Sequence, residues 1–266
     1  PWRKTRLWYP ILVSEIMLQQ TQVRRVLPYY HAFLKRFPTP GDLAKASVGD
    51  VIRIWGGLGY NKRALYLQQA TRAIIHLHAG KLPAESSDLL ALSGIGDYTA
   101  SALRCFVHGI DVPVLDTNVK RVLGRVIWGS RLVGPTEMFN LASRLVPTGE
   151  SWEWNQGLMD IGSAFCLPKN PKCPLCPLHE CCNASPEFSA WKFGAKERPV
   201  MSTVKPPRFQ DTTRYIRGKV LTHLRLLPPN STIGVLDLGQ QITPEFTKND
   251  LPWFQRLLGQ LNEDGL

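Results

Sequence analysis

The cysteines are the residues of this sequence whose spacing most clearly predicts chemistry. Five of the six crowd into a short stretch, and four of these follow the pattern Cys166-x6-Cys173-x2-Cys176-x5-Cys182. Four thiolates in one loop suit either a tetrahedral zinc ion or a cubane iron–sulfur cluster. Only one close pair is present and the first cysteine follows an expected helix, which favours the cluster. Spacing alone leaves Cys181 or Cys182 as the fourth ligand, and such crowding indicates a reducing compartment.

Two carboxylates are candidate acid–base residues. Glu15 lies in Ile11–Gln20, a stretch that is otherwise apolar on both sides of it. Its carboxyl group either faces solvent or lies in an apolar pocket, where a raised pKa would suit general acid catalysis. Asp116 follows the apolar pair Val114-Leu115, and its carboxylate could simply cap the helix that begins there.

A glycine-containing turn is the third candidate. Leu92-Ser93-Gly94-Ile95-Gly96 precedes the helical stretch Tyr98–Val107. Two glycines between two helices let backbone amides approach an anion at a helix N-terminus. This geometry suits a DNA phosphate, as in a helix–hairpin–helix, although turns of this kind also occur for purely structural reasons.

Helices are the elements that we expect to position these residues. Apolar residues recur at helical intervals in Ile11–Gln20, Val23–Phe37, Ala64–His78 and Val119–Trp128. No stretch up to residue 165 alternates with a period of two, so the sequence predicts an all-α fold. The prolines expected in first turns or at breaks are Pro10, Pro28, Pro40 and Pro83.

The chain after the cysteines is expected to form a linker and a small module. Residues 186–207 are rich in proline and poor in apolar periodicity, which is typical of a linker. Tyr215–Leu227 and Leu251–Leu261 have helical patterns, separated by a short segment around Thr232–Ile242. These three short elements within 208–266 resemble a winged-helix module that stops before its wing.

The balance of charge predicts a polyanionic partner. The 266 residues include 32 Lys and Arg against 21 Asp and Glu, a net charge of +11, and nucleic acid is the commonest partner of such a chain. Nine of the basic residues lie between Lys192 and Arg225, against two acidic ones. The longest purely apolar runs fall well short of the roughly 18 residues that span a bilayer. A soluble protein is therefore expected.

Taken in chain order, these motifs resemble those of one family. Glu15, the hairpin at 92–97, Asp116 and the four-cysteine spacing resemble the helix–hairpin–helix DNA glycosylase superfamily with a 4Fe–4S cluster. Within it, the stretches Val13–Gln22, Gly57–Tyr60 and Asn155–Asp160 resemble MutY-type adenine DNA glycosylases. The resemblance covers about 1–185. It implies a glycosylase domain there, with a six-helix subdomain at about 9–118 and a cluster subdomain made of the N-terminus and about 119–185.

The resemblance implies a reaction, the excision of adenine mispaired with 8-oxoguanine or guanine after the base has been flipped out. Glu15 would protonate the purine ring, and Asp116 would stabilise the positive charge that develops on the sugar. Asn118 and Tyr98 match positions that orient this pair. Endonuclease III, a relative, has a Schiff-base lysine at the position of Tyr98, so the tyrosine predicts a monofunctional glycosylase without strong AP-lyase activity.

The other site residues follow from the same resemblance. The adenine pocket would be formed by Trp2, Arg3, Gln156 and Met159, with the Gln156 amide reading the base edge. The opposite base and the aromatic wedge beside it would involve Gln20, Thr21, Leu58 and Tyr60. A DNA phosphate would bind the hairpin at Ser93, Gly94, Ile95 and Gly96, where a monovalent cation would also fit. The 4Fe–4S cluster would be held by Cys166, Cys173, Cys176 and Cys182.

The implied partner is double-stranded DNA containing a mismatch or lesion, bound by a monomer. The expected location is the nucleoid in the cytoplasm of a bacterium or archaeon, or the nucleus of a eukaryote.

Three departures from the family pattern leave alternatives open. Thr117 stands where glycine is usual, Asn61 replaces a second tyrosine, and residues 208–266 are too short for the NUDIX-like domain that checks 8-oxoguanine. The basic helix around Arg214–Arg225 is expected either to add non-specific DNA affinity or only to pack on the catalytic body. A glycosylase for hypoxanthine, uracil or thymine, and a non-catalytic DNA-binding protein of the same fold, remain as alternatives.

Overall fold

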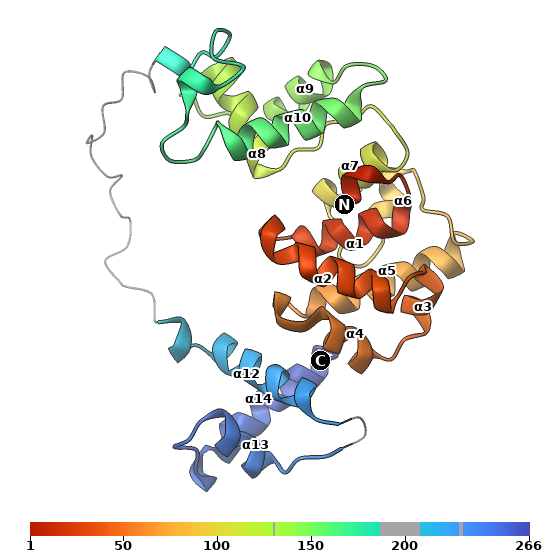
Figure 1. Ribbon diagram of the computed structural model, residues 1–266, viewed down its shortest axis with the longest axis vertical. Coiled ribbons are helices and arrows are strands. Elements are labelled where there is room, and N and C mark those ends of the chain that lie inside the picture. Colours follow the sequence, from red (N-terminus) through yellow and green to blue (C-terminus); the bar gives the residue numbers. More distant parts are fainter. Residues whose placement is uncertain (130, 187–207, 229–230) are drawn as a thin grey trace. The chain divides into compact units, whose positions relative to one another are not determined.

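The computed structural model describes residues 1–129, 131–186, 208–228 and 231–266. All the regular elements in these ranges are helices, which confirms the predicted all-α fold (Figure 1). No helix in these ranges is long and apolar enough to cross a membrane.

The chain forms two compact units. Unit 1 comprises residues 1–11 and 83–91 together with the described residues from 95 to 186. Unit 2 comprises residues 12–82 and 92–94 together with the described residues from 208 onward. The boundary therefore divides the first α-helix and also the hairpin. The predicted division into a six-helix and a cluster subdomain stays a prediction.

Five helices follow one another between Trp8 and Leu77. They are α1 (Trp8–Leu18), α2 (Val23–Arg36), α3 (Pro40–Lys45), α4 (Val48–Trp55) and α5 (Lys62–Leu77). Helix α5 packs against α3 and α4, and α2 packs against α4. The fully buried ring of Phe33 meets those of Phe37 and Trp55 edge-on, with centroid distances of 5.1 and 6.1 Å. These aromatic contacts form part of the core of unit 2.

The expectation that Pro28 lies in a first turn or at a break is wrong. Pro28 lies inside α2, five residues after its first residue, Val23. An interior proline removes a backbone hydrogen bond and costs about 3 kcal/mol. The helix nevertheless continues, because Val26, Tyr30 and Phe33 on its buried face anchor it in the core. Tertiary packing outweighs the local cost here.

Unit 1 is built around a pair of packed helices. Its helices are α6 (Ser86–Leu90), α7 (Asp97–Phe106), α8 (Thr117–Leu123), α9 (Pro135–Leu145) and α10 (Ser151–Ala164). Helix α8 packs along α10, which also contacts α7. Val119 and Val122 of α8 share one core cluster with Leu158 of α10. Directly after α8, the chain makes a π-helical turn, Gly124–Trp128.

The described residues of the C-terminal module form three α-helices with a core of their own. They are α12 (Thr213–Leu226), α13 (Val235–Ile242) and α14 (Leu251–Glu263) (Figure 1). The core includes Val220, Leu238, Phe246, Phe254 and Leu257. The described residues of the module contain helices but no strand, so they provide no wing. Residues 187–207 of the expected linker lie outside the described residues.

Candidate active site and cysteine cavity

Glu15 is buried in the middle of α1. Its exposed fraction is 5%, and Val13, Ile16 and Met17 around it in the chain are completely buried. The expected alternative of a solvent-facing helix carboxylate is therefore wrong, and the buried alternative is confirmed. A buried carboxyl group of this kind is a candidate for general acid catalysis.

Asp116 is the N-cap of α8, as the sequence predicts. Its Oδ1 accepts a hydrogen bond from the Val119 backbone N–H at 2.6 Å. Its Oδ2 accepts a second bond, from the Asn118 side-chain amide, at 3.1 Å. The carboxylate is thus fixed by two N–H donors, one on each oxygen. The pairing of Asp116 with Asn118 agrees with the orienting role that the resemblance implies for Asn118.

Helix α10 positions the segment that leads to Asp116. The buried side chain of Asn155 accepts a bond from Val114 N at 2.8 Å and donates one to Val112 O at 3.0 Å. Its amide also donates to Ser151 O within α10. Because these bonds hold the extended segment on both sides of Pro113, the start of α8 has a fixed position relative to α10.

Arg121 continues the network from Asp116 towards the cysteines. Its Nη2 donates to Asn118 Oδ1 at 2.7 Å and to Gly162 O at 2.8 Å, while its Nε donates to Cys166 O at 2.6 Å. Asp116, Asn118, Arg121 and Cys166 are therefore joined by consecutive hydrogen bonds. A displacement of the cysteine loop would reach the Asp116 carboxylate through only two side chains.

Gly162 lets α8 and α10 approach closely at this network. A Cβ atom at position 162 would lie 2.6 Å from the Asn118 Cβ and 3.2 Å from its Cα. Real Cβ atoms do not come so close, so any larger residue would push Asn118 away. The glycine is thus needed for packing and not for a turn.

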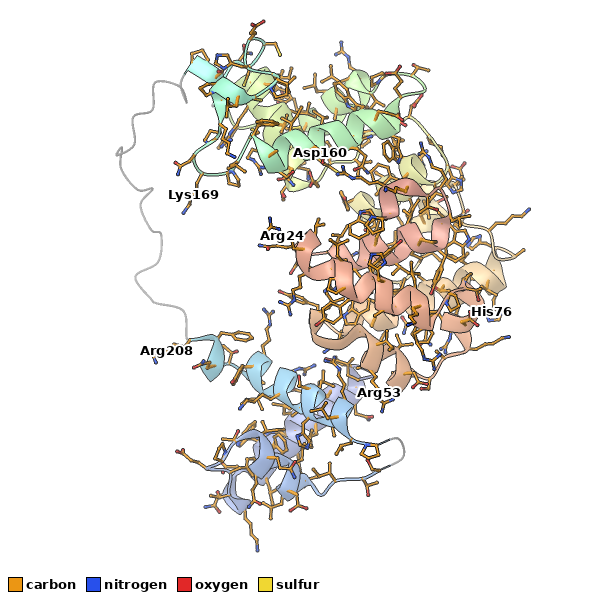
Figure 2. The ribbon with its side chains drawn as sticks, viewed as in Figure 1. Arg24, Arg53, His76, Asp160, Lys169 and Arg208 are labelled. Carbon is orange, nitrogen blue, oxygen red and sulfur yellow. The ribbon has the colours of Figure 1, made fainter. Side chains whose placement is uncertain are left out.

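The residues expected to form the adenine pocket also lie in unit 1. Gln156 is 8% exposed on α10, and Met159 packs against the α8–α10 core cluster. Arg3, in the 3-10 helix η1 (Trp2–Lys4), makes a two-pronged ion pair with Asp160 of α10, with both N–O distances 2.8 Å (Asp160 is labelled in Figure 2). The N-terminal turn that carries Trp2 is thereby tied to the helix that carries Gln156.

The four predicted cluster ligands line one cavity. Cys166, Cys173, Cys176 and Cys182 all face it, together with Arg125 and His179. Cys181 is exposed and lies outside this lining, so the structure favours Cys182 over Cys181 as the fourth thiol. In the described ranges, no group of three or more His, Cys, Asp or Glu side chains is arranged to hold a single metal ion.

Arg125 braces the cavity from the π-helical turn. Its guanidinium donates to Cys166 Sγ at 3.4 Å and to Leu167 O at 2.7 Å. Its own carbonyl accepts a bond from Ala184 N at 3.1 Å. The turn therefore holds both ends of the cysteine loop. Burial, with a further contribution from the neighbouring thiols, raises the pKa of Cys173 and Cys182, and a metal that binds them as thiolates would release protons.

In unit 2, Arg63 ties the end of α1 to the turn before α5. Its guanidinium donates to the carbonyl groups of Ile16, Met17, Gln19 and Gly59 and to the Thr21 hydroxyl. Burial lowers the pKa of Arg63 to about 10. The guanidinium thus satisfies carbonyl groups that the end of α1 leaves without a helical partner.

Arg63 also organises the residues expected at the opposite base. Thr21 is among its acceptors, and the preceding Gln20 has a positive φ of 54°. Tyr60 also has a positive φ, 48°, and its exposed fraction is 49%, so it is an exposed turn residue. Leu58 is buried, at 3% exposed.

The hairpin has the backbone geometry that its glycines predict. Gly94 has a φ of +76°, and a Cβ there would lie 2.7 Å from the Cβ of Tyr66. Its carbonyl accepts a bond from the Gln19 side chain at 3.1 Å. Gly96 is the N-cap of α7, and Tyr98 is the second residue of that helix. Ile95 is buried, while Ser93 is partly exposed.

Sequence reasoning missed three arginines of these sites. Arg63, Arg121 and Arg125 bind mainly backbone carbonyl groups far away in the chain, a type of contact that leaves no motif. It also missed the ion pair between Arg3 and Asp160, although an acidic residue one helical turn after Gln156 was a signal for it.

The fold agrees with the comparisons to known proteins. The family model described as HhH-GPD superfamily base excision DNA repair protein matches residues 13–148. An adenine DNA glycosylase of Mycolicibacterium smegmatis is 38% identical over 228 residues, covering 85% of this chain and 75% of that protein. The human adenine DNA glycosylase is 36% identical over 201 residues, covering 69% of this chain and 36% of that protein.

One solved structure adds a further likeness. A thermostable thymine-DNA glycosylase matches with a TM-score of 0.66 and 31% identity, covering 70% of this chain and 88% of that one. Fold and motif together define a base excision DNA repair protein of the helix–hairpin–helix class. Within that class, the chain belongs to the adenine DNA glycosylase family.

Proposed function

We propose that this chain is a monofunctional DNA glycosylase that removes adenine mispaired with 8-oxoguanine or guanine. The observation that carries the proposal is the contrast between two carboxylates. Glu15 is almost fully buried within a helix, whereas Asp116 is partly exposed and held by two N–H donors. Carboxylates in such different environments suit two different tasks in one reaction.

Glu15 supplies the proton in this proposal. Adenine is a poor leaving group as an anion, and protonation of a purine ring nitrogen lets it depart neutral. Glu15 is almost fully buried, and in this proposal its carboxyl group gives its proton to the flipped base.

Asp116 stabilises the sugar in this proposal. Cleavage of the glycosidic bond leaves positive charge on the deoxyribose, and an ionised carboxylate lowers the energy of that state. The bonds from Val119 and Asn118 hold the carboxylate still, so it need not reorganise as charge develops. Capping α8 and stabilising charge are compatible roles of one side chain.

Gln156 selects the base. An amide carries both a donor and an acceptor and can match the edge of adenine, although hypoxanthine could use the same group with the amide turned over. The nearly complete burial of Gln156 and its place one turn before the anchored Asp160 favour a fixed orientation.

The absence of a strong lyase step follows from the residue at position 98. A tyrosine cannot form the Schiff base that strand cleavage requires. Of the amines in unit 2, Lys62 lies 2.6 Å from Asp264, and the hydrogen bond to that carboxylate raises the pKa of Lys62. A protonated lysine is a poor nucleophile, so Lys62 does not replace the missing amine.

The cysteine cavity fits a 4Fe–4S cluster. Four thiols line it, and a guanidinium donates to one of them, as suits thiolate ligands. Cys166, Cys173, Cys176 and Cys182 would hold the cluster, which when bound would cross-link the loop and could carry an electron. The protein itself connects this cavity to Asp116, through hydrogen bonds that run from Cys166 by way of Arg121 and Asn118.

Replacement of single cysteines tests this ligand set. We expect Cys182→Ser to lose most of its iron and visible absorbance, whereas the matched variant Cys181→Ser keeps both. The reason is that Cys182 lines the cavity and Cys181 is exposed. Iron content per chain and the absorbance spectrum measure this without any activity assay. Equal iron in both variants, or zinc in the wild-type protein, would contradict the assignment.

The function itself is tested by single-turnover base release from short duplexes. Adenine is placed opposite 8-oxoguanine, guanine, cytosine or thymine, and a parallel set carries hypoxanthine, uracil or thymine as the target. We expect the fastest release for adenine opposite 8-oxoguanine or guanine. Release of thymine but not adenine would reverse the substrate assignment, an outcome made worth testing by the likeness to a thymine-DNA glycosylase.

A further inference from the structure

The C-terminal module docks on the turn that carries Tyr60. Arg225 Nη2 donates to Asn61 Oδ1 at 2.7 Å. Asp264, just after α14, lies 2.6 Å from Lys62 Nζ and also pairs with Arg217. Because the module has its own apolar core, these polar contacts with the start of α5 hold it in place within unit 2.

The same face of α12 brings a third arginine to this turn. Arg214, Arg217 and Arg225 are spaced by three and eight residues, so they project from one side of the helix. The Arg214 guanidinium lies over the Tyr60 ring, 5.3 Å from its centroid. Arg225 binds the turn directly and Arg217 does so only through Asp264, and both fix the helix that presents Arg214. Arg217 and Arg225 thus make contacts within unit 2.

Tyr60 consequently lies under two guanidinium groups. Arg63 is 5.4 Å from the ring centroid and is itself fixed by the carbonyl groups at the end of α1. The ring is half exposed, and its backbone adopts a conformation that residues other than glycine rarely adopt. Cations within about 6 Å of an aromatic centroid attract it. Two of them narrow the range of orientations that an exposed ring can sample.

We propose that Arg214 is a positioning residue for Tyr60, through which the C-terminal module prepares the ring to insert into the DNA duplex. The proposal rests on the proposed function, in which Tyr60 is the wedge beside the opposite base. An inserted ring loses side-chain freedom, and a ring already held in place loses less. The module therefore acts through Tyr60 and needs no base contact of its own.

The test uses the full chain and a duplex with a fluorescent adenine analogue next to the mispair. Fluorescence rises when the neighbouring stack opens, so it reports insertion without bond cleavage. We expect Arg214→Ala to weaken this opening about two- to fivefold, the worth of one exposed cation–π contact. Arg256→Ala removes the same charge from an exposed site on α14 and should leave the opening unchanged. Melting temperatures of both variants should match the wild type.

Two further variants separate positioning from a general effect of charge. Arg214→Lys keeps a cation over the ring and should restore most of the opening. In a Tyr60→Leu background, Arg214→Ala should cause no additional loss, because the ring that it positions is gone. An equal loss in that background, or identical behaviour of Arg214→Ala and Arg256→Ala, would overturn the proposal. If the wild type opens the duplex but releases no adenine, the proposed function fails while the positioning role stands.

Discussion

Asp116→Asn should bind mispaired DNA normally and release adenine about 10³-fold more slowly than the wild type, because the charge that stabilises the sugar is gone. Asparagine is as good an N-cap as aspartate, and its oxygen can still accept the Val119 N–H bond. Its amide nitrogen cannot accept the bond from Asn118, so the variant loses that one hydrogen bond together with the charge. The start of α8 should therefore keep its place, and the melting temperature should stay near that of the wild type.

Single-turnover rates at saturating DNA and an equilibrium binding titration measure the two quantities separately. The matched control is Asp42→Asn, which alters the carboxylate of the capping box at α3 and should leave the rate unchanged. A variant that loses binding and rate together would show Asp116 to be structural. Full activity in Asp116→Asn would support the alternative of a different catalytic carboxylate.

Glu15→Gln should lower the rate of adenine release by about 10²- to 10⁴-fold, the usual contribution of a general acid. Glutamine has nearly the same shape, so the packing of α1 around Val13, Ile16 and Met17 should be kept. What disappears is the ability to give a proton. Circular dichroism and the melting temperature check that the fold is intact, and single-turnover release measures the loss.

An adenine analogue with carbon in place of the accepting ring nitrogen tests whether the proton of Glu15 goes to that nitrogen. The wild type should release this analogue as slowly as Glu15→Gln releases adenine, and the two changes together should cost little more than either alone. Glu153→Gln, at an exposed site on α10, is the control and should behave like the wild type. Additive losses would mean that Glu15 acts by some other route.

Several features of the site could be predicted because they have local causes. The helical period marks α1, α2, α5 and α8, and Asp116 caps α8 because an aspartate before an apolar-periodic stretch is a helix start. The shared cavity of the four cysteines follows from their closeness in the chain. Whether Glu15 would be buried could not be decided from its neighbours alone, since the stretch around it is apolar on all sides.

The features that could not be predicted from the sequence depend on contacts between residues far apart in the chain. Arg63 is a structural centre of unit 2, yet its acceptors at Ile16 and Met17 are backbone atoms that any residue type would provide. Asn61 departs from the family pattern, and the structure explains it by a hydrogen bond from Arg225, which lies 164 positions later in the chain. In the basic stretch, Arg217, Lys219 and Arg225 bind partners within unit 2, and the expected DNA affinity of the stretch stays a prediction.

Gly162 is a position where helix propensity alone gives the wrong guide to stability. By propensity, alanine at this position of α10 would be favoured by about 0.5–1 kcal/mol. The added methyl group would, however, lie 2.6 Å from the Asn118 Cβ, and overpacking of this kind costs about 1–3 kcal/mol. We therefore expect the melting temperature to fall and the displaced Asn118 to leave the Asp116 carboxylate misaligned. A redesign for heat tolerance that scores each helix by itself would thus harm the fold and the site together.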